Sequence, residues 1–196
     1  MYPFIILAAG NSSRMGQPKP FVKINSQLTL LEYLVSGLKN CNVSQITVVL
    51  NNEGKKIIDS LYSYLNYEIN IVINQLPEKG RLYSLKMGLS KIGSSSVFIQ
   101  NVDNPFINKK LIFEMSHLLK PSAFVVPVYQ NQGGHPVLLS AEITSSLISN
   151  QTETNNFRVF LSQYQKIRYA CEFQEILLNL NCPSDIEAFK KKFKKF

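Results

Sequence analysis

The sequence lacks tryptophan and contains few cysteine and charged residues. Three cysteines occur in 196 residues, they lie far apart, and none forms a CxxC pair. An odd number of isolated cysteines argues against a disulfide framework and a zinc site, so we expect reduced thiols in a cytoplasmic protein. Charged residues make up 17% of the chain and hydrophobic residues 45%, a composition typical of globular rather than disordered proteins. The cysteines are Cys41, Cys171 and Cys182.

Long hydrophobic runs are also absent. No segment approaches the roughly 20 apolar residues of a membrane-spanning helix, so we expect no membrane span. The apolar run over residues 2–9 is short, and no positive charge precedes Arg14. A secretory signal needs a basic start and a longer apolar core, so we expect a protein that is not exported.

Positive charge is concentrated at the end of the chain. The formal net charge is +8, and five lysines lie in the last seven residues, so the rest of the chain is only mildly basic. A mild positive balance suits a polyphosphate substrate and does not by itself indicate nucleic-acid binding. Phe189, Phe193 and Phe196 share one face of the expected terminal helix, which favours a packed helix with a solvated lysine face. Contact of this tail with nucleic acid or a membrane surface is the alternative.

Strand-like and helix-like segments alternate through the first two-thirds of the chain. We expect strands over residues 3–9, 45–50, 68–73, 97–100 and 123–128. We expect helices over residues 29–39, 55–65, 82–92 and 111–119. This order predicts one α/β domain over residues 1–196, with a Rossmann-like three-layer α/β/α fold and a mostly parallel sheet.

The last third of the chain is less regular. Residues 141–149 and 157–164 have helical patterns, and residues 166–173 and 175–180 have strand patterns. A basic terminal helix is expected over residues 185–196.

Three polar loops follow predicted strands. They cover residues 10–19, 74–81 and 101–105. In an open parallel sheet, ligands bind outside the carboxyl ends of the strands, so these loops are expected to meet at one site.

The first loop has the composition of a phosphate-binding turn. Residues 7–19 read LAAGNSSRMGQPK. Gly10, Ser12 and Gly16 suit a turn whose backbone N–H groups approach anionic oxygens, and Arg14 and Lys19 add cations. The spacing matches neither GK[ST] nor GxGxxG. A polar surface turn with two solvated cations is the alternative.

This loop resembles the signature LAAGxSxRMGxPK of nucleotidyltransferases with a MobA-like fold, and it is most similar to the branch that includes molybdenum-cofactor cytidylyltransferase. Four further segments are similar to family motifs: N…GxxxSLxxG, DxP, G-[HN]-P-V-[LF] and the TPED that closes the fold. The matching residues are Asn74, Gly80, Ser84, Leu85, Gly88, Asp103, Pro105, Gly134, Pro136, Val137, Leu138, Pro183 and Asp185.

The resemblance implies a nucleoside triphosphate and Mg²⁺, with an acceptor phosphate attacking the α-phosphorus and pyrophosphate leaving. By the same resemblance Arg14, Lys19 and Asp103 are the catalytic candidates, with Asp103 also binding the metal. The implied nucleotide-binding residues are Leu7, Ala8, Ala9, Gly10, Ser12, Gly16, Asn74, Gly80 and Ser84. Such a reaction requires mainly positioning and charge neutralisation, and these residue types provide both.

The segment after the fourth expected strand reads VDNPF, where the family more often has DMP or DQP, and the closing segment also departs from the family pattern. The family usually has DxDTPED, whereas Asn179 and Asn181 stand here in place of both first aspartates. An amide oxygen can ligate Mg²⁺, so Asn181 is the expected second metal ligand, with weaker binding than a carboxylate would give. A nucleotide-binding relative without turnover is therefore an alternative.

Substrate identity is only partly indicated. Ala9 stands where guanylyl-transferring relatives typically have glycine, which favours CTP over GTP. The resemblance implies a phosphorylated small-molecule acceptor such as the molybdopterin cofactor. Arg81 follows Gly80 and could meet phosphate or face water, so we leave it out of the predicted catalytic set. His135 could touch the acceptor or simply fix a turn. The sequence does not indicate an oligomeric state.

Overall fold

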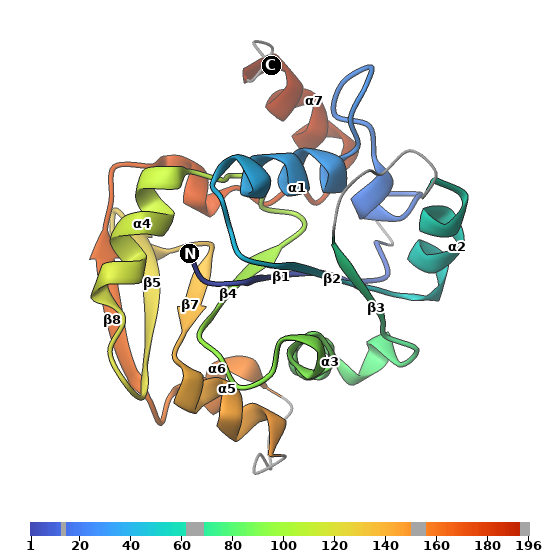
Figure 1. Cartoon of the computed structure of the whole chain (residues 1–196). Coiled ribbons are helices and arrows are strands. Elements are labelled where there is room, and N and C mark those ends of the chain that lie inside the picture. The colour runs from blue at the N-terminus through green and yellow to red at the C-terminus, as the bar shows by residue number, and fades with distance from the viewer. Residues whose placement is uncertain (13–14, 62–68, 150–155, 193–196) are drawn as a thin grey trace.

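The computed structural model describes residues 1–12, 15–61, 69–149 and 156–192 (Figure 1). Eight strands form one sheet in the order β3-β2-β1-β4-β7-β5-β6, with β8 pairing β5. The strands are β1 (Phe4–Ala8), β2 (Ile46–Leu50), β3 (Asn70–Ile73), β4 (Val97–Asn101), β5 (Ala123–Tyr129), β6 (Gln132–Gly133), β7 (Val137–Leu139) and β8 (Gln165–Ala170).

The sheet is mostly parallel, as predicted. β3, β2, β1 and β4 run parallel, and β8 runs parallel to β5. β7 is antiparallel to both β4 and β5, and β6 is antiparallel to β5. The carboxyl ends of β1 and β4 therefore lie together, with Leu7 opposite Asn101 in the ladder.

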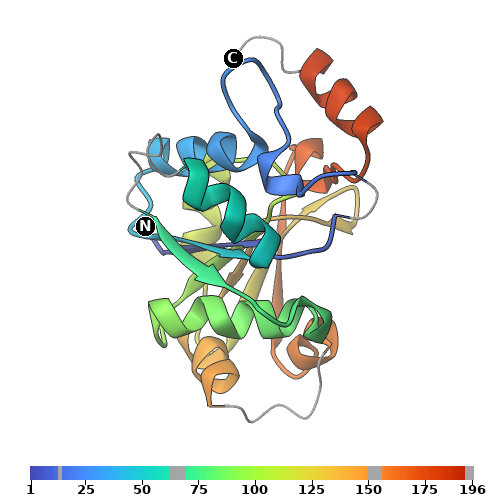
Figure 2. The same ribbon diagram turned by 90° about the vertical axis from the view of Figure 1, so that its right-hand side faces the viewer.

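Helices cover both faces of the sheet, which gives the three layers (Figures 1 and 2). α1 (Leu30–Asn40) and α4 (Lys109–Leu118) pack with one core cluster, and α3 (Arg81–Ile92) and α5 (Ala141–Ile148) with the other. The remaining helices are α2 (Asn52–Leu61), α6 (Phe157–Leu161) and α7 (Pro183–Lys192), and the 3-10 helices are η1 (Lys19–Phe21), η2 (Pro77–Lys79) and η3 (Gln174–Leu177).

The central strand β1 is buried on both faces, because alternate side chains enter opposite cores. Phe4 and Ile6 belong to the cluster under α1, and Ile5 and Leu7 to the cluster under α3. Gly88 lets α3 approach the sheet closely, since a Cβ there would lie 2.9 Å from Ile5 Cγ2. The continuous apolar run at the start of the chain thus fixes β1 as the middle of the fold.

A capping box starts α1. The Thr29 hydroxyl accepts a hydrogen bond from Glu32 N at 3.3 Å, and the Glu32 carboxylate accepts one from Thr29 N at 2.6 Å. This arrangement satisfies two backbone donors at the helix start. The capping box therefore fixes the start of α1 directly after Thr29.

The C-terminal third differs from the sequence prediction in several places. The strand expected over residues 175–180 is wrong, because Gln174–Leu177 is a 3-10 helix. The short strands β6 and β7 were not predicted. The helix expected over residues 157–164 ends at Leu161, and the strand expected over residues 166–173 ends at Ala170.

The described part of the terminal helix is packed. Phe189 is 5% exposed, and its ring contacts Tyr33 edge-on at a centroid separation of 5.8 Å. Lys190 pairs with Glu187 and Lys192 with Glu175 on the surface. Phe193 and Phe196 lie outside the described residues.

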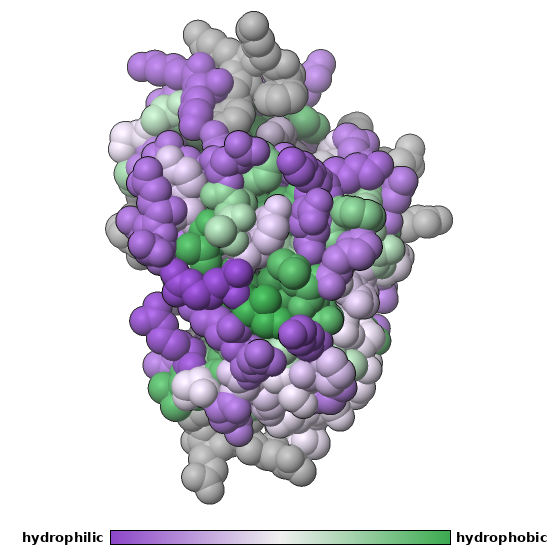
Figure 3. All heavy atoms as spheres, turned by 90° about the vertical axis from the view of Figure 1, so that its left-hand side faces the viewer, coloured by the Kyte–Doolittle hydropathy of each residue, from purple (hydrophilic) through white to green (hydrophobic). Residues whose placement is uncertain are grey.

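The face that carries α4 and β8 shows a limited hydrophobic patch surrounded by hydrophilic side chains (Figure 3). Across the described ranges, no helix combines the length and hydropathy needed to cross a membrane.

Candidate functional site

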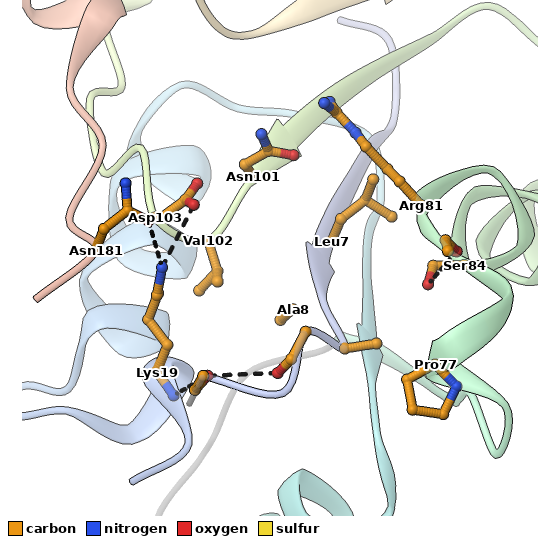
Figure 4. Close-up of a pocket in the computed structure, with 14 residues that line it drawn as sticks. Leu7, Ala8, Lys19, Pro77, Arg81, Ser84, Asn101, Val102, Asp103 and Asn181 are labelled. Atoms are coloured by element: carbon orange, nitrogen blue, oxygen red, sulfur yellow. Dashed lines mark hydrogen bonds and ion pairs between the residues drawn. The ribbon is translucent and has the colours of Figure 1, made fainter. Parts of the chain in front are cut away.

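A pocket of about 420 Å³ lies at the carboxyl ends of β1 and β4 (Figure 4). Three chain segments that are distant in sequence form one side of it, and the start of α3 forms the other. Its lining residues are Leu7, Ala8, Ala9, Gly10, Ser12, Lys19, Pro77, Gly80, Arg81, Ser84, Asn101, Val102, Asp103 and Asn181.

Ser12 organises the first loop. Its hydroxyl lies 3.4 Å from the Gly10 carbonyl, to which it donates, and it accepts a hydrogen bond from Lys19 N at 2.9 Å. These contacts fold the loop back and direct Lys19 into the pocket (Figure 4). Gly16 adopts φ +67°, which glycine tolerates, but it does not line the pocket. Arg14 lies outside the described residues.

Lys19 is the meeting point of the three segments. Its Nζ donates to Asn181 Oδ1 at 3.0 Å and lies 3.4 Å from Asp103 Oδ2 (Figure 4). The side chains of Lys19 and Asp103 are only 13% and 25% exposed, so this ion pair is weakly screened. The structure therefore brings together Lys19, Asp103 and Asn181, three of the residues that the sequence analysis assigned to the phosphates and the metal.

Asn104 joins the loop after β4 to the segment that ends in Asn181. It is fully buried, and its Nδ2 donates to the carbonyls of Ile176 at 2.7 Å and Leu178 at 2.8 Å. Leu180 N donates to the Asp103 carbonyl at 2.8 Å. These bonds join the β4 loop to the segment that ends in Asn181, so Asn181 reaches the pocket without belonging to the sheet.

Asp185 fixes the other end of that segment. Its Oδ2 accepts hydrogen bonds from Asn181 N at 2.8 Å and Cys182 N at 2.9 Å. Hydrogen bonds from Cys182 and from the Asn181 backbone hold the pKa of Asp185 below its usual value. The Asp185 side chain thus anchors the start of α7, while Asn179 is exposed and lies outside the pocket lining.

Asn74 lies behind the pocket wall that the start of α3 forms, and it supports that wall through Ser84. It is fully buried and does not line the pocket, but its Nδ2 donates to Ser84 Oγ at 2.9 Å. Its Oδ1 accepts from Leu76 N at 2.8 Å, which shapes the turn before α3. Gly80 begins that helix with φ +87°, a left-handed conformation that favours glycine.

Sequence reasoning missed several pocket residues, including Pro77, Asn101 and Val102, and left out Arg81. Arg81 follows a loop at the carboxyl edge of the sheet, and this placement was the available signal. Asn101 ends β4, and its Nδ2 lies 3.0 Å from His135 Nε2. Burial lowers the pKa of His135 to about 4, and the nearby charge of Arg81 acts in the same direction. His135 is therefore neutral at pH 7.

The donor set fits a magnesium ion that is held largely by substrate. Within the described ranges, no cluster of three or more His, Cys, Asp or Glu side chains could hold a metal. Asp103 Oδ1 is buried and has no hydrogen-bond partner, so one carboxylate oxygen is available for a cation. Mg²⁺ is commonly bound by one or two carboxylates together with phosphate oxygens and water, and Asp103 with Asn181 suits that arrangement.

Comparison with known families decides the wider assignment. Residues 4–167 match the model of the MobA-like NTP transferase domain. The chain belongs to this family. The resemblance noted in the first loop is thereby confirmed, and the chain is a nucleotidyltransferase by family.

Both a cytidylyltransferase and a probable guanylyltransferase are similar to the chain over most of its length. The molybdenum cofactor cytidylyltransferase of Escherichia coli is 27% identical over 189 residues, covering 96% of this chain and 95% of that protein. A probable molybdenum cofactor guanylyltransferase of Natranaerobius thermophilus is 25% identical over 203 residues, covering 95% and 94%.

Solved structures agree on the fold. A nucleotidyl transferase from Methanothermobacter superposes with a TM-score of 0.80 at 17% identity, covering 100% of this chain and 98% of that chain. A Mycobacterium tuberculosis protein in complex with manganese gives a TM-score of 0.75 at 14% identity, covering 97% and 98%. The predicted Rossmann-like class is therefore correct.

Proposed function

We propose that this protein transfers a nucleotide, with CMP favoured, from a nucleoside triphosphate to a phosphorylated small molecule, with the molybdenum cofactor as the favoured acceptor. An oxygen of the acceptor phosphate attacks the α-phosphorus, the bond to the bridging oxygen of the β-phosphate breaks, and pyrophosphate leaves. The observation that carries the proposal is the convergence of Lys19, Asp103 and Asn181 beside a buried, unpartnered carboxylate oxygen.

Different residues of the pocket would bind the base and sugar, the phosphates and the metal. Small residues at the end of β1 leave room for the base and sugar, and Gly80 and Ser84 form the wall beside the base. Lys19 directs an ammonium group with three donors at the phosphates, and the contacts described above use two of them. Asp103 and Asn181 would hold Mg²⁺, which when bound supplies charge neutralisation at the phosphate oxygens.

We also propose that residues 1–196 act as one nucleotidyltransferase domain. The family match ends at residue 167, yet Asn181 lies beyond that point and lines the same pocket. The three free cysteines favour a reducing, cytoplasmic location.

Nucleotide choice gives the first test of the proposal. Ala9 adds a methyl group to a wall of the pocket, and a pyrimidine needs less room than a purine. We expect pyrophosphate release with Mg²⁺, molybdopterin and CTP, and slower release with GTP. Competition titration is expected to show tighter binding of CTP. Tighter binding of GTP would reverse the base assignment, whereas nucleotide binding without pyrophosphate release would favour the non-catalytic alternative.

Lys19→Ala is expected to weaken CTP binding by about 10- to 100-fold and to leave cytidine binding nearly unchanged. The reason is that the lost ammonium faces phosphate, and a charge-assisted hydrogen bond of about 1.5–3 kcal/mol corresponds to that range. Calorimetry with both ligands measures the difference. Lys23→Ala removes an exposed lysine four residues away and serves as the matched control. Equal losses for CTP and cytidine would contradict the assignment.

A further inference from the structure

A second pocket of about 1010 Å³ adjoins the nucleotide pocket. It lies between β5, β7 and α6, and aromatic and cationic side chains line it, including Phe157, Tyr164, Arg158 and Lys166. Arg81 lines both pockets. The two spaces therefore meet at this one guanidinium.

The position of Arg81 is held by an aromatic ring. Its guanidinium carbon lies 5.4 Å from the centroid of the Phe157 ring, within the range of a cation–π contact. Phe157 opens α6, and the Asn156 side chain caps that helix by accepting from Arg158 N at 2.9 Å and Val159 N at 3.3 Å. A capped helix thus presents the ring, and the Arg81 side chain extends toward Asn101 (Figure 4).

The phosphate of the acceptor needs a positive charge at the junction of the two pockets. An acceptor phosphate must come close to a triphosphate, and the two anions repel each other. Among the described residues that line the nucleotide pocket, the cationic side chains are Lys19 and Arg81. Lys19 is held by Asp103 and Asn181 on the other side of the nucleotide pocket from Arg81 (Figure 4). His135, which lies near Arg81, is neutral at pH 7 and adds no positive charge there.

We propose that Arg81 binds the phosphate of the acceptor at the junction of the two pockets, while the second pocket receives the acceptor's planar ring. The inference rests on the proposed function and names the acceptor's binding residue. The family motif GxxxSLxxG leaves position 81 unspecified, so the resemblance assigns Arg81 no role. A guanidinium suits the position because its planar fork donates two parallel hydrogen bonds to phosphate oxygens.

The test compares a pterin that carries a phosphate monoester with the same pterin without phosphate. Fluorescence titration of nucleotide-free protein measures binding of each. Arg81→Ala is expected to weaken binding of the phosphorylated pterin by about 10- to 100-fold and to leave the other pterin unchanged, because only the phosphate contact is lost. Arg81→Lys is expected to restore part of the affinity, and Lys91→Ala, on the same helix, is the control.

Kinetics give an independent readout. In Arg81→Ala we expect a raised KM for molybdopterin with the Kd for CTP and Mg²⁺ unchanged. Equal weakening of both pterins would show a structural role, and loss of CTP affinity instead would place Arg81 on the triphosphate. Either result overturns the inference. Wild-type protein that binds the phosphorylated pterin through Arg81 but releases no pyrophosphate would refute the proposed function and leave this assignment standing.

Discussion

Asp103→Asn is expected to lower Mg²⁺-dependent nucleotidyl transfer by about a thousandfold or more while the protein stays folded. Asp103 provides the one carboxylate among the described pocket residues, and its Oδ1 is buried without a partner. An amide of the same shape keeps the packing but removes the negative charge that attracts the metal. Losing several kcal/mol of charge stabilisation corresponds to a rate loss of that size. Pyrophosphate release under saturating CTP measures it.

The same chemical change at an exposed site provides the control. Asp59→Asn, on α2, is expected to leave the rate unchanged. The reciprocal variant Asn181→Asp is expected to tighten Mg²⁺ binding, because it places a second carboxylate beside Lys19 and restores the charge that the family usually has. Crystals soaked with manganese and nucleotide should place the ion against Asp103. Full activity of Asp103→Asn would show that the metal site lies elsewhere.

The part of the site formed by the loops after β1 and β4 could be predicted, because each loop directly follows a strand that is recognisable in the sequence. A buried strand followed by small residues and a lysine specifies a ligand loop almost by itself, and the parallel order of the strands places the β4 loop at the same edge. Asp103 was predicted from this position together with the family resemblance. Asn181 was predicted only through the closing family motif, since no periodic pattern relates residues 181 and 19.

The rest of the site depends on tertiary contacts that leave no local pattern. Residues 175–180 are rich in hydrophobic side chains like a buried strand, yet Gln174–Leu177 forms a 3-10 helix. The Asn104 amide donates to the carbonyls of Ile176 and Leu178 in this segment. β7 is three residues long and is specified by its neighbours on both sides rather than by its own propensity. Arg81 gains its position from Phe157, which is 76 positions later in the chain. A single sequence gives no sign of such contacts between residues that are far apart in the chain.

Asn104→Asp is expected to destabilise the protein by about 3 kcal/mol or more at pH 7, which is large for an isosteric change. Asn104 is fully buried, and its amide nitrogen donates to the Ile176 and Leu178 carbonyls. The substitution replaces that donor by a carboxylate oxygen, which removes two hydrogen bonds and faces two carbonyl oxygens with a negative charge. Denaturant unfolding of wild type and variant at pH 7 measures the difference.

The pH dependence of that loss identifies its cause. Burial against carbonyls raises the pKa of the introduced carboxyl in the folded state above its value of about 3.9 in the unfolded chain. The folded state therefore binds the proton more tightly, so the stability deficit is smallest below about pH 4 and grows as the pH rises from there toward the folded-state pKa. Asn179→Asp, at an exposed asparagine in the same segment, should cost less than about 0.5 kcal/mol at any of these pH values. A deficit at position 104 that did not change with pH would mean that lost packing, and not the buried charge, is responsible.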